Sequence, residues 1–367
     1  MDKAEIAAKQ SAEINRDAAL TRYVADVACK VAADHCGDIR VYVFDRPFFN
    51  ATMAPNGYAE VWSGLLLRVD SEAELAFVLG HEAAHFIENH SIEAHNADKT
   101  RSNVTLAVTV GVAAVGVAAA SQAATPQAAQ SMIDATGNLI DTLYLANIAG
   151  YFRFSRANET EADTLGLQAA HAAGYPATAA AASWTSVIKE AEASDFERKR
   201  KRPAQVGVFD SHPLSSQRVE ALTQQASTLP AIEDADGAER HRAAIKPHLS
   251  AWLRDDLRRR DFGETLFIIE RLSSRGEDLG VLGFYRGEAH RLRRQDGDLA
   301  KARAAYEAAS AHPDAPAALW RELGEIYRRD NDTAKARVAF ETYLARAPSA
   351  EDTWLVEESL ASLKQGT

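Results

Sequence analysis

Cysteine is scarce in this chain, which has only Cys29 and Cys36 among its 367 residues. Two cysteines are too few for a disulfide-stapled scaffold or for a zinc site built from thiolates. They can still form one bridge, because their seven-residue spacing joins the end of a predicted helix to the turn that begins near His35. The alternative is a pair of unpaired, small apolar side chains. The spacing leaves both interpretations open.

The chain also lacks an excess of positive charge, since 41 lysines and arginines stand against 52 aspartates and glutamates, for a net charge of -11. A general nucleic-acid binder presents a strongly basic surface, so we expect no nucleic-acid partner. With 46% hydrophobic and 25% charged residues, the composition is that of an ordinary globular protein. It excludes wholesale disorder and a polytopic membrane protein.

Long, strongly apolar runs are missing as well. Residues 1–22 are charged and contain no apolar core, so we expect no secretory signal within this chain, although a removed signal would leave the same appearance. Val104–Ala120 carries no charge, but its alanines, glycines and threonines contribute little transfer free energy. We expect a helical hairpin there that is buried or makes peripheral contact with a membrane. A transmembrane helix, which needs about 20 strongly apolar residues, is the alternative.

Periodicity predicts mostly helix with a small sheet. We expect helices over 2–35, from Ser71 to about His90, from about Ile133 to Phe152 and over Arg156–Ala173, and a strand at Arg40–Phe44. Pro55-Asn56-Gly57 is a turn signal between residues 50–53 and 58–62, which predicts a β-hairpin. The basic cluster Arg198–Arg202 lies in a polar stretch, where we expect a mobile, solvated surface loop.

The C-terminal third contains an internal repeat, because residues 298–307 match residues 332–341 at an offset of 34 residues. This offset is the tetratricopeptide period. The second copy has the expected residues at the expected spacings: Trp320, Leu323, Gly324, Tyr327, Ala336, Phe340 and Pro348. Trp354 opens what we interpret as a terminal capping helix. Repeats of this kind stack helix pairs around a groove, and their usual role is to bind peptides or proteins.

The strongest chemical signal is His81-Glu82-Ala83-Ala84-His85, an H-E-x-x-H motif within a predicted helix. Two histidines four residues apart share one helical face, so both imidazoles can reach one Zn²⁺. Glu82 would lie beside the metal, where it can accept a proton from the attacking water. The motif predicts a catalytic zinc site with one ion per chain.

A third ligand must come from another helix, and Glu159 and Asp163 lie four residues apart on one predicted helical face. One of these two carboxylates can bind the metal while the other holds a ligating histidine. Glu161 points about 200° away from Glu159 on that helix, so we expect it to be solvated or capping. His90 and His95 follow the motif on a polar stretch, and we interpret both as surface residues.

Several further segments match one family pattern together with these residues: Asn50-Ala51, Pro55-Asn56-Gly57, Gly64-Leu65-Leu66, Glu74-Leu75-Ala76, Ala173-Gly174-Tyr175, and Ser211-His212-Pro213 with Arg218. With the H-E-x-x-H and E-x-x-x-D motifs, this set resembles the family-48 metallopeptidases. These are gluzincins of the HtpX and CAAX-prenyl-protease type, and they include a soluble periplasmic branch with appended tetratricopeptide repeats. The resemblance covers about 37–228 for the protease and the remainder for the repeats.

The resemblance implies roles for individual residues. His81, His85 and Glu159 would bind zinc, Glu82 would be the general base, and Asp163 would orient a ligand histidine. His212 would approach the metal, where it either occupies the fourth position or stabilises the oxyanion. Arg218 would pair with a site carboxylate or cap a helix that begins near Ser215.

The expected fold is an α+β, zincin-type (gluzincin) protease domain, mostly helical with a small β-sheet, followed by an all-α tetratricopeptide-repeat domain. We expect an N-terminal helical segment over 1–36, the protease over 37–228 and the repeats over 238–367. The integral-membrane members of the family carry several transmembrane helices, and only the weak run 104–120 stands here in place of one. Prenylated substrates are therefore not expected.

The expected function is zinc-dependent hydrolysis of peptide bonds in misfolded or unassembled cell-envelope proteins, with the repeats selecting clients. The backbone edge of one strand would hold substrate as an added strand: Tyr58, Ala59, Glu60, Val61 and Trp62. We expect a periplasmic or envelope location, with the cytoplasm as the alternative. A chaperone or adaptor with a latent zinc site is the alternative function.

Overall fold

The computed structural model of the protein describes residues 2–90, 155–201, 216–233 and 236–365. The predicted hairpin at 104–152, His95 and the Ser211-His212-Pro213 motif lie outside the described residues. The chain forms two compact units, Met1–Lys189 with Lys201–Ala244, and Glu190–Arg200 with Ile245–Thr367. Each unit is described by itself below.

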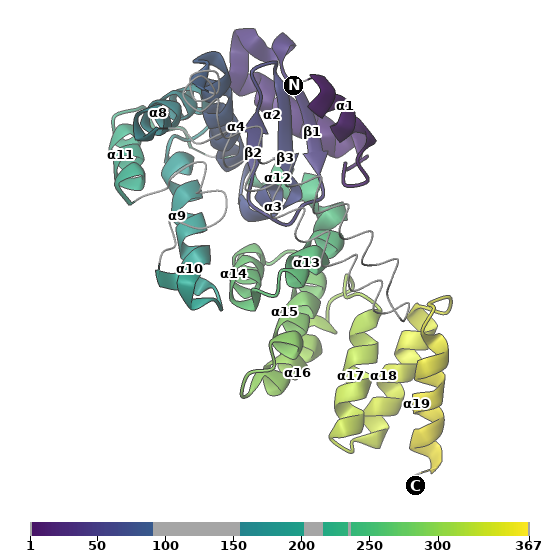
Figure 1. The fold of residues 1–367 in the computed structure, drawn as a ribbon. Coiled ribbons are helices and arrows are strands. Elements are labelled where there is room, and N and C mark those ends of the chain that lie inside the picture. The colour runs from purple at the N-terminus through teal and green to yellow at the C-terminus, as the bar shows by residue number, and fades with distance from the viewer. Residues whose placement is uncertain (1, 91–154, 202–215, 234–235, 366–367) are drawn as a thin grey trace, which may run out of the picture. The chain divides into compact units, whose positions relative to one another are not determined.

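The first unit is mostly helical with a three-stranded sheet (Figure 1). Its elements are α1 (Asp2–Gln10), α2 (Ala18–Ala32), η1 (Ala33–Asp38), β1 (Arg40–Phe44), β2 (Ala51–Met53), β3 (Tyr58–Trp62), α3 (Ser63–Arg68), α4 (Glu72–Ile87), α8 (Arg156–Ala172), α9 (Thr178–Ala193), α11 (Ser216–Ser227) and α12 (Ala238–Ile245). Cys29 at the end of α2 and Cys36 in η1 form a disulfide, so the bridge is confirmed.

The sheet has the order β1-β3-β2, with β3 parallel to β1 and antiparallel to β2. The hairpin of β2 and β3 is therefore confirmed, and Gly57 occupies its turn at φ 78°, where a side chain is disfavoured. The prediction that Tyr58–Trp62 offers a free edge to substrate is wrong. Because β1 and β2 occupy both of its edges, β3 is the central strand and all five of its residues are buried.

Helix α4 begins as predicted, because the Ser71 hydroxyl accepts a hydrogen bond from the Glu74 amide. The Glu74 carboxylate in turn accepts from the Asp70 amide at 2.9 Å. Nearly the whole helix is buried between α2, α8 and β2. Helix α8 also matches its prediction, and Gly174 at φ 91° follows its end.

Two glycines bring α4 and α8 unusually close together. A Cβ added to Gly80 would lie 3.0 Å from the Gly166 carbonyl oxygen, and one added to Gly166 would lie 2.7 Å from the His81 nitrogen. Neither side could accept even a methyl group without a shift of backbone. The crossing of the two helices is therefore in van der Waals contact next to His81.

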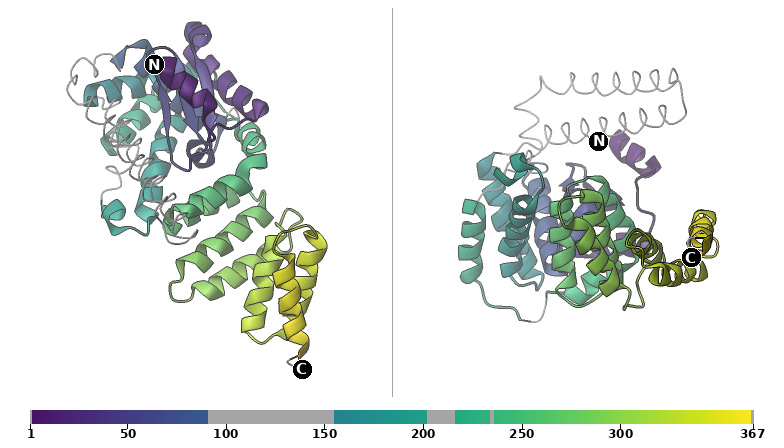
Figure 2. Two further views of the ribbon diagram at one scale, coloured as in Figure 1. Left: turned by 45° about the vertical axis from the view of Figure 1, so that its right-hand side comes forward. Right: turned by 90° about the horizontal axis from the view of Figure 1, so that it is seen from below.

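The second unit is all-helical in its described part (Figures 1 and 2). Its elements are α10 (Glu197–Lys201), η4 (Lys246–His248), α13 (Leu249–Arg258), α14 (Phe262–Ser273), α15 (Leu279–Arg293), α16 (Asp298–Ala309), α17 (Ala318–Arg329), α18 (Thr333–Arg346) and α19 (Thr353–Gln365). Helix α15 packs on α16 and α17 packs on α18. In both pairs a glycine of the first helix lies under an aromatic ring of the second, Gly287 under Tyr306 and Gly324 under Phe340.

The expected basic loop at Arg198–Arg202 is helical through Lys201, so that prediction is wrong. Lys199 anchors this short helix, because its ammonium lies 2.9 Å from Asp261 and 3.0 Å from Glu264. Two buried carboxylates outweigh the mutual repulsion of the basic run that suggested a loop.

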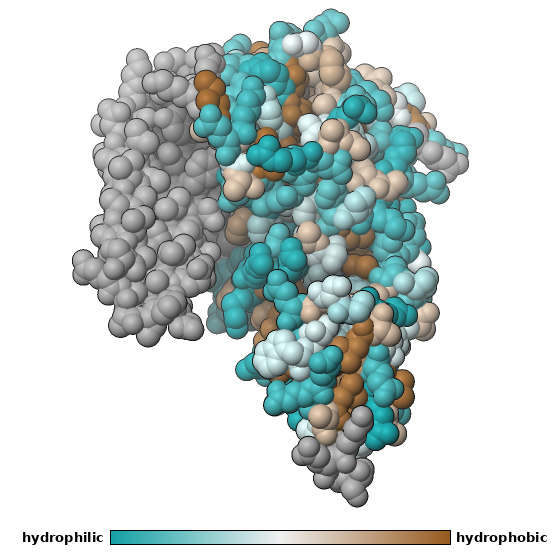
Figure 3. Space-filling model, turned by 90° about the vertical axis from the view of Figure 1, so that its right-hand side faces the viewer, coloured by the Kyte–Doolittle hydropathy of each residue, from teal (hydrophilic) through white to brown (hydrophobic). Residues whose placement is uncertain are grey.

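On the coloured part of the face drawn in Figure 3, hydrophilic residues predominate, with smaller apolar patches among them. Among the described residues, no helix has the length and apolar character needed to cross a membrane.

Candidate metal centre

Two imidazoles from α4 face each other across one helical turn. The Nε2 atoms of His81 and His85 lie 3.1 Å apart, and each side chain is 1% exposed. The arrangement suits a shared cation that both lone pairs face.

Glu159 from α8 completes the cluster. Its carboxylate oxygens lie 3.7 Å from His81 Nε2 and 3.4 Å from His85 Nε2, and it is also 1% exposed. Of the two candidate carboxylates, the structure therefore turns Glu159 toward the paired nitrogens. The ligand atoms of His81, His85 and Glu159 all lie within 4.8 Å of one another.

The spacing of the two imidazole nitrogens and the carboxylate suits a metal ion held between them. Zinc binds nitrogen and oxygen at about 2.0–2.1 Å, and a tetrahedron with such bonds has ligand–ligand edges of about 3.3 Å. In the structure the two Nε2 atoms are 3.1 Å apart, and the nearest Glu159 oxygens are Oε1 at 3.4 Å from His85 and Oε2 at 3.7 Å from His81. Two imidazoles and one carboxylate are also the donor set of a catalytic zinc site, which keeps its fourth position open.

Asp163 supports the cluster from behind His81. Its carboxylate lies 3.1 Å from His81 Nδ1, and it accepts hydrogen bonds from Trp184 at 3.1 Å and from Arg218 at 2.6 and 2.7 Å. Burial would raise the pKa of the Asp163 carboxyl, but the hydrogen bonds from Arg218 and His81 hold it below its usual value. An ionised Asp163 keeps the proton on His81 Nδ1 and leaves Nε2 as the metal-facing lone pair.

Arg218 also contacts Glu159, with 2.8 Å between its guanidinium and Oε2. It lies in the first turn of α11 and is buried, so the structure has it bridging both carboxylates of α8. Of the two roles left open for Arg218, pairing with site carboxylates is the one observed. This one cation balances part of the negative charge buried beside the histidines.

His90 is the site residue that sequence reasoning missed, because it is 3% exposed rather than on the surface. Its Nδ1 lies 2.9 Å from His85 Nδ1, and its Nε2 lies 3.4 Å from Glu161, whose side chain is half exposed. Helix α4 ends at Ile87, and Asn89 at φ 59° turns the chain so that His90 packs against His85. A spacing of five residues does not repeat on one helical face, so periodicity carried no signal for this contact.

The other predicted site residues have three different outcomes. Glu82 is buried on α4 next to His81, 5% exposed. His212 lies outside the described residues. Tyr58 and Trp62 both donate to the buried Glu60 carboxylate, at 2.5 and 3.2 Å, and so bind within the sheet.

Comparison with known proteins identifies the family in which this metal cluster occurs. The model of Peptidase family M48 matches residues 15–226, more than half of the chain and all of the metal cluster. The chain belongs to peptidase family M48. Members of M48 are zinc metallopeptidases, and His81, His85 and Glu159 are the described residues able to hold the zinc ion.

Individual M48 relatives are distant. A Vibrio cholerae protein described as a beta-barrel assembly-enhancing protease is 27% identical over 197 residues, 54% of this chain and 36% of that protein. The mitochondrial metalloendopeptidase OMA1 of Schizosaccharomyces pombe is 28% identical over 211 residues, 56% of this chain and 52% of that protein. Metalloendopeptidase OMA1 of Bos taurus is 43% identical over 51 residues, 14% of this chain and 10% of that protein. This chain thus spans about half or less of the curated relatives it matches.

Proposed function

We propose that this protein is a zinc-dependent endopeptidase that hydrolyses peptide bonds of misfolded or unassembled envelope proteins. The observation that carries the activity is the buried convergence of His81 Nε2, His85 Nε2 and a Glu159 oxygen, with Glu82 on the same helix. Zinc held there supplies Lewis-acid polarisation of the scissile carbonyl and lowers the pKa of the attacking water.

The remaining steps belong to the chain's own residues. Glu82 takes the proton of the attacking water and passes it to the leaving amine nitrogen, as a general base that becomes a general acid. Asp163 and His90 hold the two ligand histidines in the tautomer that directs each Nε2 lone pair at the metal. His85 Nδ1 donates to His90 Nδ1 in this assignment, which leaves the His90 Nε2 proton for Glu161.

Substrate is held by a strand of the sheet other than the predicted one. Among the described strands, β2 lies at an edge of the sheet and packs against α4, the helix that carries His81 and His85. We assign to the Ala51–Met53 backbone the role that the sequence first suggested for β3, addition of an extended substrate segment.

A role for His212 at the metal is proposed on the family resemblance alone. An imidazole that takes the fourth position on the metal would exclude the attacking water, whereas one that donates to the oxyanion would assist the reaction. The two roles predict opposite results for His212→Ala. Basal cleavage rises if His212 blocks the site, and kcat falls by about 10²–10³ if it stabilises the oxyanion. Unchanged kcat and zinc affinity would remove His212 from the site.

The all-helical unit is proposed to be a tetratricopeptide array that selects clients. Its support is the 34-residue offset, which relates Tyr306 to Phe340, and the glycine that lies beneath each of these rings, although Gly287 and Gly324 are 37 residues apart. The name of the Vibrio cholerae relative and the Cys29–Cys36 disulfide support an oxidising envelope compartment. Two free thiols in unreduced protein from its native source, measured by mass spectrometry, would contradict that location.

The direct test is cleavage of an unfolded protein such as casein by the zinc-loaded protein, with and without a chelator. The proposal requires cleavage that the chelator abolishes and that added zinc restores. A protein that binds casein stoichiometrically but never cleaves it, loaded or not, would instead be the chaperone or adaptor considered from the sequence.

A further inference from the structure

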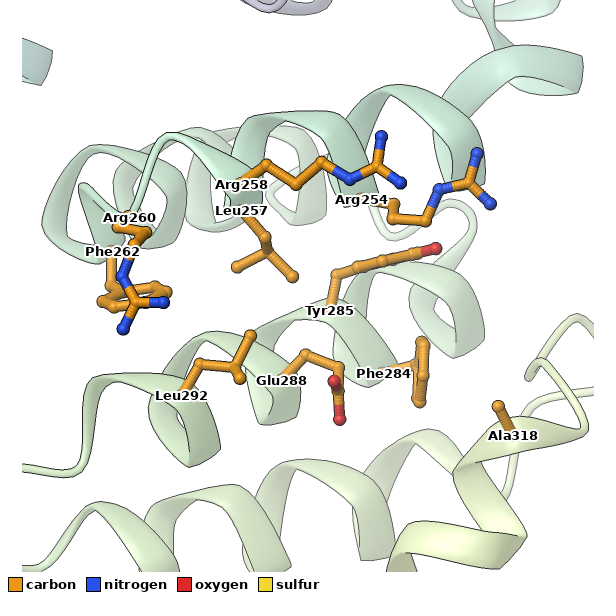
Figure 4. Close-up of a pocket in the computed structure, with 10 residues that line it drawn as sticks. All are labelled: Arg254, Leu257, Arg258, Arg260, Phe262, Phe284, Tyr285, Glu288, Leu292 and Ala318. Carbon is orange, nitrogen blue, oxygen red and sulfur yellow. The ribbon is translucent and has the colours of Figure 1, made fainter. Parts of the chain in front are cut away.

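The second unit contains a hollow of about 500 Å³ between α13 and α15 (Figure 4). We call it the arginine hollow and define it by Arg254, Arg258, Arg260, Leu257, Phe262 and Tyr285. All six residues belong to one compact unit. Its volume is that of a site for a small ligand or for one or two side chains of a peptide, not for a folded domain.

The floor of the arginine hollow is apolar and fixed in place. Leu257 and Tyr285 project into the space between α13 and α15 in Figure 4, and Phe262 closes one end. Each of the three is 6% exposed, so the floor belongs to the packed core and is not a collapsed surface loop. The Tyr285 hydroxyl lies 3.0 Å from the Ser250 hydroxyl, which satisfies its polar atom and leaves the ring as an apolar wall.

The rim carries three arginines whose positive charge is only partly compensated by one carboxylate. The Arg254 and Arg258 guanidiniums share one carboxylate oxygen of Asp255, at 3.8 and 2.8 Å, and their side chains are 60% and 71% exposed. Arg260 makes no ion pair with any described residue. The acidic lining residue Glu288 is already held by Arg291 and by the Tyr306 hydroxyl. Three arginines therefore line the hollow in a chain whose net charge is -11.

We propose that the arginine hollow binds an acidic–apolar peptide segment, in which one aromatic or aliphatic side chain enters the floor and flanking carboxylates meet the rim. Guanidinium groups bind carboxylates in a planar, bidentate fork, which favours this charge over other polar groups. The proposal deepens the client selection of the proposed function and rests on it. It gives the selected segment a chemistry, that of a hydrophobic residue between acidic ones.

The probe is a labelled, C-terminally amidated peptide with a phenylalanine flanked on each side by two glutamates. Binding is measured by fluorescence anisotropy to the full-length, zinc-loaded Glu82→Gln variant, so that the peptide is not cleaved. The combined Arg254→Gln, Arg258→Gln and Arg260→Gln changes should weaken binding at least about tenfold, as should replacing the glutamates by glutamines. Raising the salt concentration should also weaken it, because the rim is exposed.

The matched control removes the same charge elsewhere in the unit, by Arg328→Gln, Arg329→Gln and Arg346→Gln, and should leave binding within about twofold of the parent. Leu292→Asn, at a position that also lines the hollow, tests the apolar contribution and should weaken the peptide with phenylalanine but not one with serine in its place. Unchanged melting temperatures establish that each variant is folded.

Three results would overturn the proposal. The first is equal binding of glutamate- and lysine-flanked peptides, and the second is an equal loss in the control and the rim variants. The third is rim-dependent binding of phosphatidylglycerol vesicles or of an oligonucleotide in place of the peptide. If the peptide fails while chelator-sensitive casein cleavage persists, this inference falls and the proposed peptidase function stands.

Discussion

The metal centre of the first unit and the arginine hollow of the second both gather charged side chains, but they differ in how those charges are neutralised. At the metal centre, Asp163 and Glu159 are buried, and Arg218 pairs with both at less than 3 Å. At the hollow, Arg254 and Arg258 stand mostly in water and share one carboxylate. The same residue type, arginine, thus fixes geometry in one place and leaves charge available in the other.

The difference follows from the cost of moving charge out of water. A buried charge must be paired and hydrogen-bonded, and breaking such a pair costs about 3–5 kcal/mol. An exposed pair contributes about 0–1 kcal/mol, so its loss barely alters the fold. We therefore expect substitutions at the metal centre to act on chemistry and metal affinity, and substitutions at the hollow to act on partner choice alone.

The largest expected effect is at Glu82. Glu82→Gln keeps the size of the side chain but removes the base, so kcat for casein should fall by about 10²–10⁴ while zinc stays at one per chain. Glu88→Gln makes the same chemical change just past the end of the same helix and should leave kcat unchanged. Loss of zinc together with activity would show that Glu82 holds the metal rather than the proton.

A smaller effect is expected at His90, which separates a positioning role from a merely structural one. His90→Asn removes the acceptor for His85 Nδ1, so zinc affinity measured by chelator competition should fall about 10–100-fold. The unfolding temperature of the metal-free protein should change little, and His35→Asn serves as the exposed control. Unaltered zinc affinity in His90→Asn would contradict the orienting role.

A third effect concerns Glu72 in the first turn of α4, which accepts from Arg240, Tyr175 and Lys30. Burial would raise the pKa of Glu72, but these hydrogen bonds lower it from 4.5 to about 2. Because the folded pKa lies below the unfolded one, the stabilisation is complete above about pH 5 and is lost as the pH falls toward 2.

Glu72→Gln should therefore destabilise the protein by about 2 kcal/mol at pH 7 and by much less at pH 3. Urea titrations of both proteins at the two pH values measure this difference. A penalty independent of pH would assign the effect to lost packing and not to the charge.

The smallest effect is expected at the exposed arginines of the hollow, in contrast to the buried charges of the metal centre. Arg254→Gln and Arg258→Gln should each change the free energy of unfolding by less than about 0.5 kcal/mol, because both guanidiniums are exposed. Urea unfolding provides the measurement. A loss above about 2 kcal/mol would show that the rim arginines support the fold, and would weaken the assignment of a free binding surface.

Local rules predicted the elements that carry the metal ligands. The Ser71 cap and the apolar stripe located α4, and the four-residue spacings placed His81 with His85 and Glu159 with Asp163. The choice between the two carboxylates needed the family resemblance, because both share one helical face. Only the crossing of α8 on α4 turns Glu159 to the nitrogens of both histidines and Asp163 to the far side of His81.

The failures share a cause, which is contact between segments that sequence rules treat separately. The turn residues 55–57 marked β3 as half of a hairpin, but its parallel partner β1 comes from before the hairpin, and this contact removes the free edge. His90 was assigned to solvent because its neighbours are polar, and Lys199 to a loop because its neighbours are basic. The contact of His90 with His85, and of Lys199 with Asp261 and Glu264, decided these two outcomes.

The contact of Gly80 with Gly166 sets the distance between the two helices that carry the metal ligands. Where two helices touch backbone to backbone, their separation is already at its minimum and cannot drift smaller. A side chain at either position would increase the separation of α4 and α8, and so move Glu159 away from the histidine pair by a fraction of a bond length. Catalysis would then depend on Gly80 and Gly166, two residues that have no side-chain functional group.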